Sequence, residues 1–174
     1  MARLPTRHEA ATLAALIGWV LAVLLAAAPD EPPRPPTPAL ELAWDAPAPF
    51  AEGETLAQAL LEPTRIYVKS VLPLMRAGLI KGAAHITGGG LIENPPRCIA
   101  EGLQAAFDWN AWALPPVFEW LGQVGGISDH ELRRTFNCGV GFILIVSPEN
   151  AEPVLAALLN AGEEAFICGQ LEAA

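Results

Sequence analysis

Strand-like and helix-like stretches of apolar residues alternate along the chain from residue 44 onward. Short apolar runs predict strands over residues 83–87, 104–108, 142–146 and 165–169. Between these runs, apolar positions recur at the spacing of an amphipathic helix. Strands separated by helices predict the α/β fold class, here a layered sandwich with a mixed sheet and packed helices.

Local start and stop signals place the first and the last predicted helices. Thr64 is the expected N-cap of the first helix, and Pro73 should bend it. Asn150 is the expected N-cap of the last helix, which Gly162 should end. The apolar positions expected to pack inward are Ile66, Tyr67, Val71, Leu74 and Met75 in the first helix, and Val154, Leu155, Leu158 and Leu159 in the last.

Two helices are predicted between the second and third strands. The first begins at the Pro115–Pro116 pair and ends at the Gly125–Gly126 pair. The second begins with Ser128 and Glu131 at the spacing of a capping box, and Asn137 falls near its end. Their expected buried positions are Val117, Trp120, Leu121 and Val124, followed by Leu132 and Phe136.

The segment KGAAHITGGGLIENPPR, residues 81–97, carries the most informative local chemistry. A strand ending here would place two polar side chains on one face, and the three consecutive glycines can adopt positive φ. The turn would leave backbone N–H groups free to bind an anion such as phosphate. A plain tight turn remains the alternative, because neither a Walker loop nor a dinucleotide fingerprint is present. The candidate binding residues are His85, Thr87, Gly88, Gly89 and Gly90.

Composition narrows the class of partner. The chain has 174 residues, of which 52% are hydrophobic, and a net charge of -9. It is therefore large enough for one well-packed domain, and its acidity argues against binding nucleic acid. Arg97, Arg133 and Arg134 are the cations available to a phosphate, although each would serve equally well as a surface charge.

Three cysteines lie far apart in the sequence, at positions 98, 138 and 168. Their odd number and the lack of a CxxC pair indicate reduced thiols, as expected in the cytoplasm. Small or apolar neighbours favour a packing role for each thiol. The sequence predicts no metal site, and it leaves the catalytic residues unassigned.

Residues 1–43 form a leader of different composition. Its segment 10–28 is uncharged, and a proline-rich linker follows over residues 29–38. The apolar segment is typical of a signal peptide or a single membrane span. Sequence that is out of frame or otherwise not native, and a helix docked on the domain, are the other two interpretations. A membrane association is expected only if the leader is genuine.

Several motifs in residues 44–174 resemble the C-terminal half of AIR synthase, the phosphoribosylformylglycinamidine cyclo-ligase family. They are LLEPTRIYVKSVL at 60–72, HITGGGLIENPPR at 85–97, EGL at 101–103, FDW at 107–109, PPVFEWL at 115–121 and RTFNCGVG at 134–141. The resemblance implies the fold of that C-terminal domain. It also implies a role in purine biosynthesis, the ATP-dependent closure of formylglycinamidine ribonucleotide to aminoimidazole ribonucleotide.

The same resemblance implies ATP and magnesium as cofactors and a ribonucleotide as substrate. It makes the segment around His85, together with Asn137, the expected substrate-binding region. Most of the nucleotide and metal site is expected in an N-terminal domain that has no counterpart in this sequence, so a separate N-terminal half or a homodimer is an expected partner. The alternatives are a non-catalytic ribonucleotide-binding fragment, half of a split enzyme, or a gene remnant without function.

Overall fold

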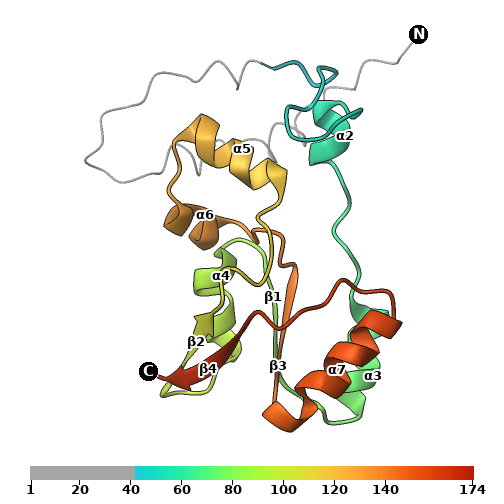
Figure 1. Ribbon diagram of the computed structural model, residues 1–174, viewed down its shortest axis with the longest axis vertical. Coiled ribbons are helices and arrows are strands. Elements are labelled where there is room, and N and C mark those ends of the chain that lie inside the picture. Colours follow the sequence, from blue (N-terminus) through green and yellow to red (C-terminus); the bar gives the residue numbers. More distant parts are fainter. Residues whose placement is uncertain (1–41) are drawn as a thin grey trace, which may run out of the picture. The chain divides into compact units, whose positions relative to one another are not determined.

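The computed structural model describes residues 42–174, of which Ala43–Ala174 form one compact unit (Figure 1). This part of the chain contains six α-helices, one 3₁₀-helix and four strands. In chain order they are α2 (Leu56–Leu60), α3 (Val68–Arg76), β1 (Ile80–His85), α4 (Gly90–Glu93), η2 (Pro95–Cys98), β2 (Leu103–Phe107), α5 (Pro116–Gly125), α6 (Asp129–Thr135), β3 (Phe142–Val146), α7 (Pro148–Asn160) and β4 (Gly169–Ala173).

The strands form two small antiparallel pairs. β1 pairs with β3, with Ala84 opposite Ile143 and His85 opposite Phe142, and a bulge interrupts the register near the start of β1. β2 pairs with β4 from Leu103 opposite Ala173 to Phe107 opposite Gly169. The α/β class is therefore confirmed at this level.

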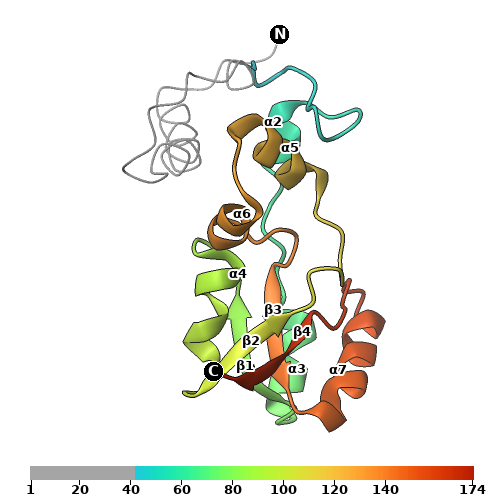
Figure 2. The same ribbon diagram turned by 60° about the vertical axis from the view of Figure 1, so that its left-hand side comes forward.

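The helices pack in two groups beside the β1–β3 pair. α3 lies next to α7 on one flank, whereas α4 lies next to α6 towards the other (Figures 1 and 2). Between β1, β3 and the α4–α6 group lies the main core, and partly buried aromatic rings from residues 107–114 cover it. The core residues are Ala84, Ile86, Leu91, Leu132, Cys138, Val140 and Ile143.

Several elements agree closely with the sequence-based predictions. The predicted strands 104–108 and 142–146 correspond to β2 and β3, whereas the predicted strand 83–87 overlaps only the second half of β1, which spans Ile80–His85. α5 begins beside the proline pair and ends at Gly126 in the left-handed conformation. Ser128 caps α6 by accepting a hydrogen bond from the Glu131 N–H. The Glu131 carboxylate, however, pairs with Arg134 instead of completing a capping box.

The prediction of a mixed sheet is wrong for residues 42–174, because both strand pairs there are antiparallel. A parallel pair needs a crossover connection, usually a helix that packs back onto the sheet. Between β1 and β3, however, α4 packs against α6, and β3 returns beside β1 in the opposite direction.

Two predicted helix starts are also wrong, for different reasons. α3 begins at Val68, four residues after Thr64, because Arg65 is held by the Glu163 carboxylate at 2.8 Å and by the Gly162 carbonyl. Ile66 therefore lies ahead of the helix. α7 begins at Pro148 with Ser147 as N-cap residue, and Asn150 lies in its first turn, since proline is favoured at the first helical position.

The last strand occupies residues 169–173, not the predicted 165–169. The apolar side chains of the predicted segment have other roles. Phe166 stacks on Trp112 with ring centres 5.7 Å apart, and the Cys168 carbonyl accepts a hydrogen bond from the Asp108 N–H. Pairing with β2 therefore starts only at Gly169.

The leader segments 10–28 and 29–38 lie outside the described residues. Among residues 42–174, none of the helices combines the length and the apolar character that crossing a bilayer requires.

We expect Leu132→Ala to lower the free energy of unfolding by about 2–5 kcal/mol, because Leu132 is only 3% exposed and its loss opens a cavity in the core. The control is Leu159→Ala in α7, where the side chain is 52% exposed, and its cost should stay below about 1 kcal/mol. Urea unfolding of both variants measures the difference. Equal losses would contradict the assignment of the core to the α4–α6 side.

Candidate functional site

A hydrogen-bonded turn follows β1 and contains the three consecutive glycines. The Gly90 N–H donates to the Thr87 carbonyl at 2.9 Å, and Gly89 has a φ of 102°. Positive φ at the third residue of such a turn favours glycine strongly. The turn therefore requires glycine at position 89 whether or not a ligand binds.

Asn94 holds this turn from inside. Its Oδ1 accepts a hydrogen bond from the Thr87 N–H at 2.6 Å, and its Nδ2 donates to the Gly88 carbonyl at 3.0 Å. The side chain is buried, so these bonds satisfy amide groups that would otherwise be costly to bury. Within residues 42–174 the N–H groups of Gly88 and Gly89 donate to no other residue, and they stay available at the turn.

The glycines differ in the space around them. A Cβ built at Gly90 would collide with the Arg133 carbonyl and would lie 2.7 Å from the Phe136 carbonyl. Gly90 therefore allows α4 to pack closely against the C-terminal end of α6. A Cβ at Gly88 would meet no atom within 4 Å, and its φ is outside the left-handed region. Gly88 is the member of the turn with open space around it.

His85 lies at the end of β1 on the exposed side of the strand. Its ring is 5.9 Å from that of Phe142 and 6.2 Å from that of Tyr67, which in turn lies 5.2 Å from Phe142. Thr87 is also exposed. The predicted pair thus lies at a surface where an aromatic group, defined here as Tyr67, His85 and Phe142, meets the glycine turn.

The Tyr67 hydroxyl lies against the backbone of Gly141. A Cβ at Gly141 would collide with its hydroxyl, so the glycine makes room for the tyrosine over β3. Partial burial raises the pKa of the Tyr67 hydroxyl, while Arg65 lowers it and Glu163 raises it further. The hydroxyl therefore stays protonated at neutral pH.

Asn137 lies directly after α6, where its Oδ1 accepts a hydrogen bond from the Gly139 N–H at 3.0 Å. This side chain organises the local turn, as expected for an Asn beside glycine. The glycine turn reaches the same region through Gly90, whose backbone packs against the Phe136 carbonyl. Of the predicted site residues, Gly90 is therefore the one in contact with the RTFN segment. His85 contacts Tyr67 and Phe142 instead.

The three arginines considered for a phosphate differ in their partners. Arg134 forms a two-pronged ion pair with Glu131, with both N–O distances at 2.7 Å, and lies 3.6 Å from Glu93 of α4. These hydrogen bonds lower the pKa of the Glu131 carboxyl. Arg133 lies 4.1 Å from the centre of the Trp109 ring. Arg97 is exposed in η2.

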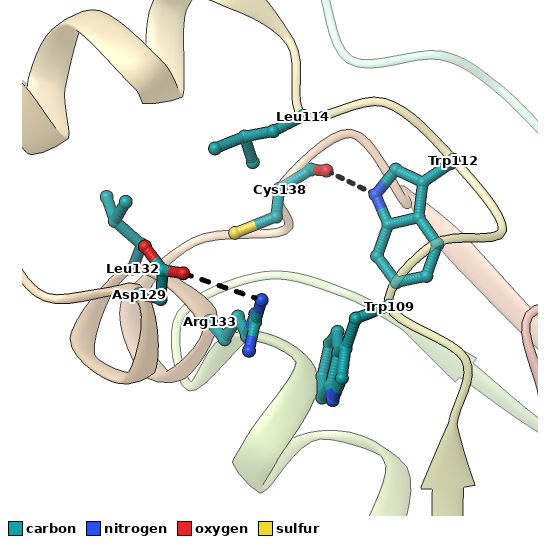
Figure 3. Close-up of a pocket in the computed structure, with 7 residues that line it drawn as sticks. All are labelled: Trp109, Trp112, Leu114, Asp129, Leu132, Arg133 and Cys138. Atoms are coloured by element: carbon teal, nitrogen blue, oxygen red, sulfur yellow. Dashed lines mark hydrogen bonds and ion pairs between the residues drawn. The ribbon is translucent and has the colours of Figure 1, made fainter.

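A cavity of about 160 Å³ lies between α6, the segment 109–114 and Cys138 (Figure 3). The Arg133 guanidinium points towards the Trp109 ring, and the Trp112 Nε1 donates to the Cys138 carbonyl at 2.9 Å. Burial raises the pKa of the Cys138 thiol to about 11, so this thiol stays neutral. The lining residues are Trp109, Trp112, Leu114, Asp129, Leu132, Arg133 and Cys138.

Residues 39–174 match the family described as AIR synthase related protein, C-terminal domain. The chain belongs to this family. The motifs at the glycine turn and at the RTFN segment are thus parts of an AIR synthase-related C-terminal domain.

Relatives of this domain are known by name. The chain is 53% and 52% identical, over 121 residues, to the phosphoribosylformylglycinamidine cyclo-ligases of two Burkholderia cenocepacia strains. These matches cover 70% of this chain and 34% of each relative. It is 50% identical over 131 residues to the bifunctional purine biosynthetic protein of Saccharomyces cerevisiae, covering 75% of this chain and 16% of that protein. The chain therefore spans about a third of the length of the cyclo-ligases it matches.

Sequence reasoning missed two residues of the AIR synthase-related domain that shape this surface. Asn94 carried one usable signal, an Asn directly before two prolines, which is typical of a turn or a chain break. Tyr67 was expected only as a core residue, and its contacts with His85 and Gly141 come from parts of the chain far away in sequence. No local pattern reports such contacts.

We expect Gly90→Ala to destabilise the AIR synthase-related domain by about 2–4 kcal/mol, since the new Cβ combines positive φ with a collision against α6. Gly88→Ala is the matched control and should change stability by less than about 0.5 kcal/mol. Thermal and urea unfolding measure both effects. A stable Gly90→Ala variant would show that α4 and α6 do not approach as described.

The Cys138 thiol predicts a specific dependence of stability on pH. Its pKa is about 11 when folded and about 9 when unfolded, so stabilisation is complete below pH 9 and is lost as the pH rises towards 11. Two pH units correspond to at most about 3 kcal/mol. Cys138→Ala should remove this part of the slope between pH 9 and 11. Parallel curves for both proteins in urea unfolding would contradict the assignment.

Proposed function

We propose that this chain supplies the C-terminal part of a phosphoribosylformylglycinamidine cyclo-ligase. The proposed reaction is the ATP-dependent closure of formylglycinamidine ribonucleotide to aminoimidazole ribonucleotide, in the cytoplasm. The observation that carries the proposal is the 53% identity to a protein of that name over 121 residues. The three free cysteines are consistent with a reducing compartment.

The proposed substrate site is the surface formed by His85, Thr87 and the glycine turn. An anion can approach Gly88 closely because this residue has no Cβ and the space where a Cβ would lie is free of other atoms within 4 Å. The N–H groups of Gly88 and Gly89 supply donors for a phosphate or formyl oxygen. His85 can add a hydrogen bond from a ring that Tyr67 and Phe142 hold in place.

Asn137 and Gly90 have weaker support as residues that contact the substrate directly. The Asn137 Oδ1 already accepts from the Gly139 N–H, which leaves only its amide N–H groups for a ligand. The Gly90 N–H donates to Thr87 within the turn. We therefore assign Gly90 a role in packing, and we assign Asn137 a role at the edge of the site.

ATP is the proposed second substrate, and its binding would need groups from outside residues 42–174. In this part of the chain, no three His, Cys, Asp or Glu side chains cluster in a way that could hold a metal. Magnesium in phosphate-binding sites is usually held by one or two carboxylates together with the phosphates, and we place no reaction step on a metal here. The contribution of this domain is to bind and orient the ribonucleotide.

A non-catalytic ribonucleotide-binding fragment is the second candidate. Both candidates bind a ribonucleotide at the glycine turn. Only the enzyme also requires the part of the cyclo-ligase that lies outside the matched region.

The test replaces the matching region of the Burkholderia cenocepacia cyclo-ligase with residues 44–174 of this chain, giving a single fused polypeptide. We expect the fusion to catalyse cyclisation. Gly88→Val should lower kcat/KM at least about tenfold without a loss of stability, because a Cβ at this position meets no atom of the domain within 4 Å but would obstruct a ligand at the turn. His85→Ala should lower it by about the same factor.

His130→Ala is the matched control, since His130 is an exposed histidine on α6 away from the turn. Its kcat/KM should stay within about twofold of the parent fusion. A folded fusion without cyclisation would exclude the enzyme. Unchanged kinetics in Gly88→Val would exclude the glycine turn as the substrate site.

A further inference from the structure

The segment between α2 and α3 exposes an unusual set of apolar side chains. Ile66 is 79% exposed and Val68 is 61% exposed, the highest values among the large exposed hydrophobic residues of the described chain. Leu60 and Leu61, at the other end of the segment, are also exposed. Exposed apolar residues grouped in this way mark a contact surface more often than isolated ones do.

The backbone of this segment is unpaired as well. Residues 62–67 belong to no helix or strand, and Figures 1 and 2 show them as a long connection between α2 and α3. Within the described residues, the N–H groups of Glu62, Thr64, Arg65 and Ile66 have no hydrogen-bond acceptor. A row of free N–H and C=O groups is what an incoming strand pairs with.

The segment is nevertheless held in a fixed place. Arg65 is bound by Glu163 and by the Gly162 carbonyl, and Ser70 lies 2.7 Å from the other oxygen of Glu163. Tyr67 packs against His85 and Phe142. Because these anchors lie at its C-terminal end, the segment presents its apolar side chains without needing a partner to position them.

Its surroundings indicate the chemistry of a partner. A groove of about 580 Å³ borders the segment and is lined by Glu54, Ala57, Gln58, Leu61, Glu62 and Pro63. Its lining thus combines two acidic residues, Glu54 and Glu62, with three apolar ones, Ala57, Leu61 and Pro63. Such a surface suits a strand with apolar residues on one side and at least one basic residue near its end.

We propose that residues 60–68 dock the part of the cyclo-ligase that precedes this domain in its relatives, with a strand of that part pairing along residues 62–67. The matched region is a C-terminal domain and covers only 34% of those relatives, so their remaining chain precedes it. The docking segment also lies near the start of the matched region and continues, through Tyr67, to the proposed substrate site. This inference rests on the proposed function for the identity of the partner.

The test co-expresses the full 174-residue chain with the part of the Burkholderia cenocepacia cyclo-ligase that precedes its matched region. The two should co-purify. Hydrogen exchange followed by mass spectrometry should show the amides of residues 62–67 exchanging at least about tenfold more slowly in the complex than in the free chain, because pairing removes them from water. Amides of the turn at Gly102 should exchange at the same rate in both.

The variant Ile66→Asp with Val68→Asp should weaken the complex at least about tenfold, since it puts charges into an apolar contact. The matched control is Leu159→Asp with Ile167→Asp, where both side chains are 52% exposed, and it should bind like the wild type. Failure to co-purify, unchanged exchange at 62–67, or equal loss in both variants would overturn the proposal. So would protection of 62–67 in a homodimer of the free chain.

These readouts do not depend on turnover. A complex with protected residues 62–67 that performs no cyclisation would remove the proposed function and leave the docking surface intact. An active fused enzyme whose residues 62–67 exchange freely would support the proposed function and exclude the docking surface.

Discussion

The buried amide of Asn94 is the contact on which the candidate site depends. It pairs with one N–H and one C=O of the glycine turn, as a neighbouring strand would, in a part of the described chain where β1 has ended. With the turn closed in this way, the Gly88 and Gly89 N–H groups have no acceptor within the described residues, and Gly90 packs against α6. The two hydrogen bonds of Asn94 therefore determine which glycines of the turn are accessible and which one packs against α6.

The two faces of β1 have different structural roles. The α4–α6 side contains the core and is tied together by Gly90 and by the Arg134 ion pairs with Glu131 and Glu93. His85 lies on the opposite side of the strand, where its exposed ring is close to Tyr67 and Phe142. The core residues on one face of β1 thus support an exposed histidine and its aromatic neighbours on the other.

Sequence patterns predicted the elements whose signals are local. Proline pairs, a Ser N-cap and a short β-branched run gave α5, α6 and β3 close to their observed bounds. The errors at Thr64 and at 165–169 have a common cause, because Arg65 and Phe166 are placed by partners far away in sequence, Glu163 and Trp112.

The candidate site was predictable to a similar extent. The location of the turn followed from the glycines, and the family followed from the order of the motifs. Asn94 and Tyr67 could not be assigned, because their roles arise from burial and from contacts across the fold. The pairing of strands was likewise not encoded locally, since antiparallel and parallel neighbours have similar apolar runs.

Glycines serve two structural purposes in this domain. Gly126 and Gly162 let the backbone turn with positive φ, and a Cβ built at Gly162 would meet no atom within 4 Å. Gly139 and Gly141 make room for a neighbour, the Pro115 ring in one case and the Tyr67 hydroxyl in the other, and Gly139 also has a positive φ. In the motif RTFNCGVG, these two glycines therefore lie where side chains from 24 and 74 positions earlier in the chain, Pro115 and Tyr67, pack against the backbone. A glycine signature can identify a family while marking where the chain touches itself, with no ligand involved.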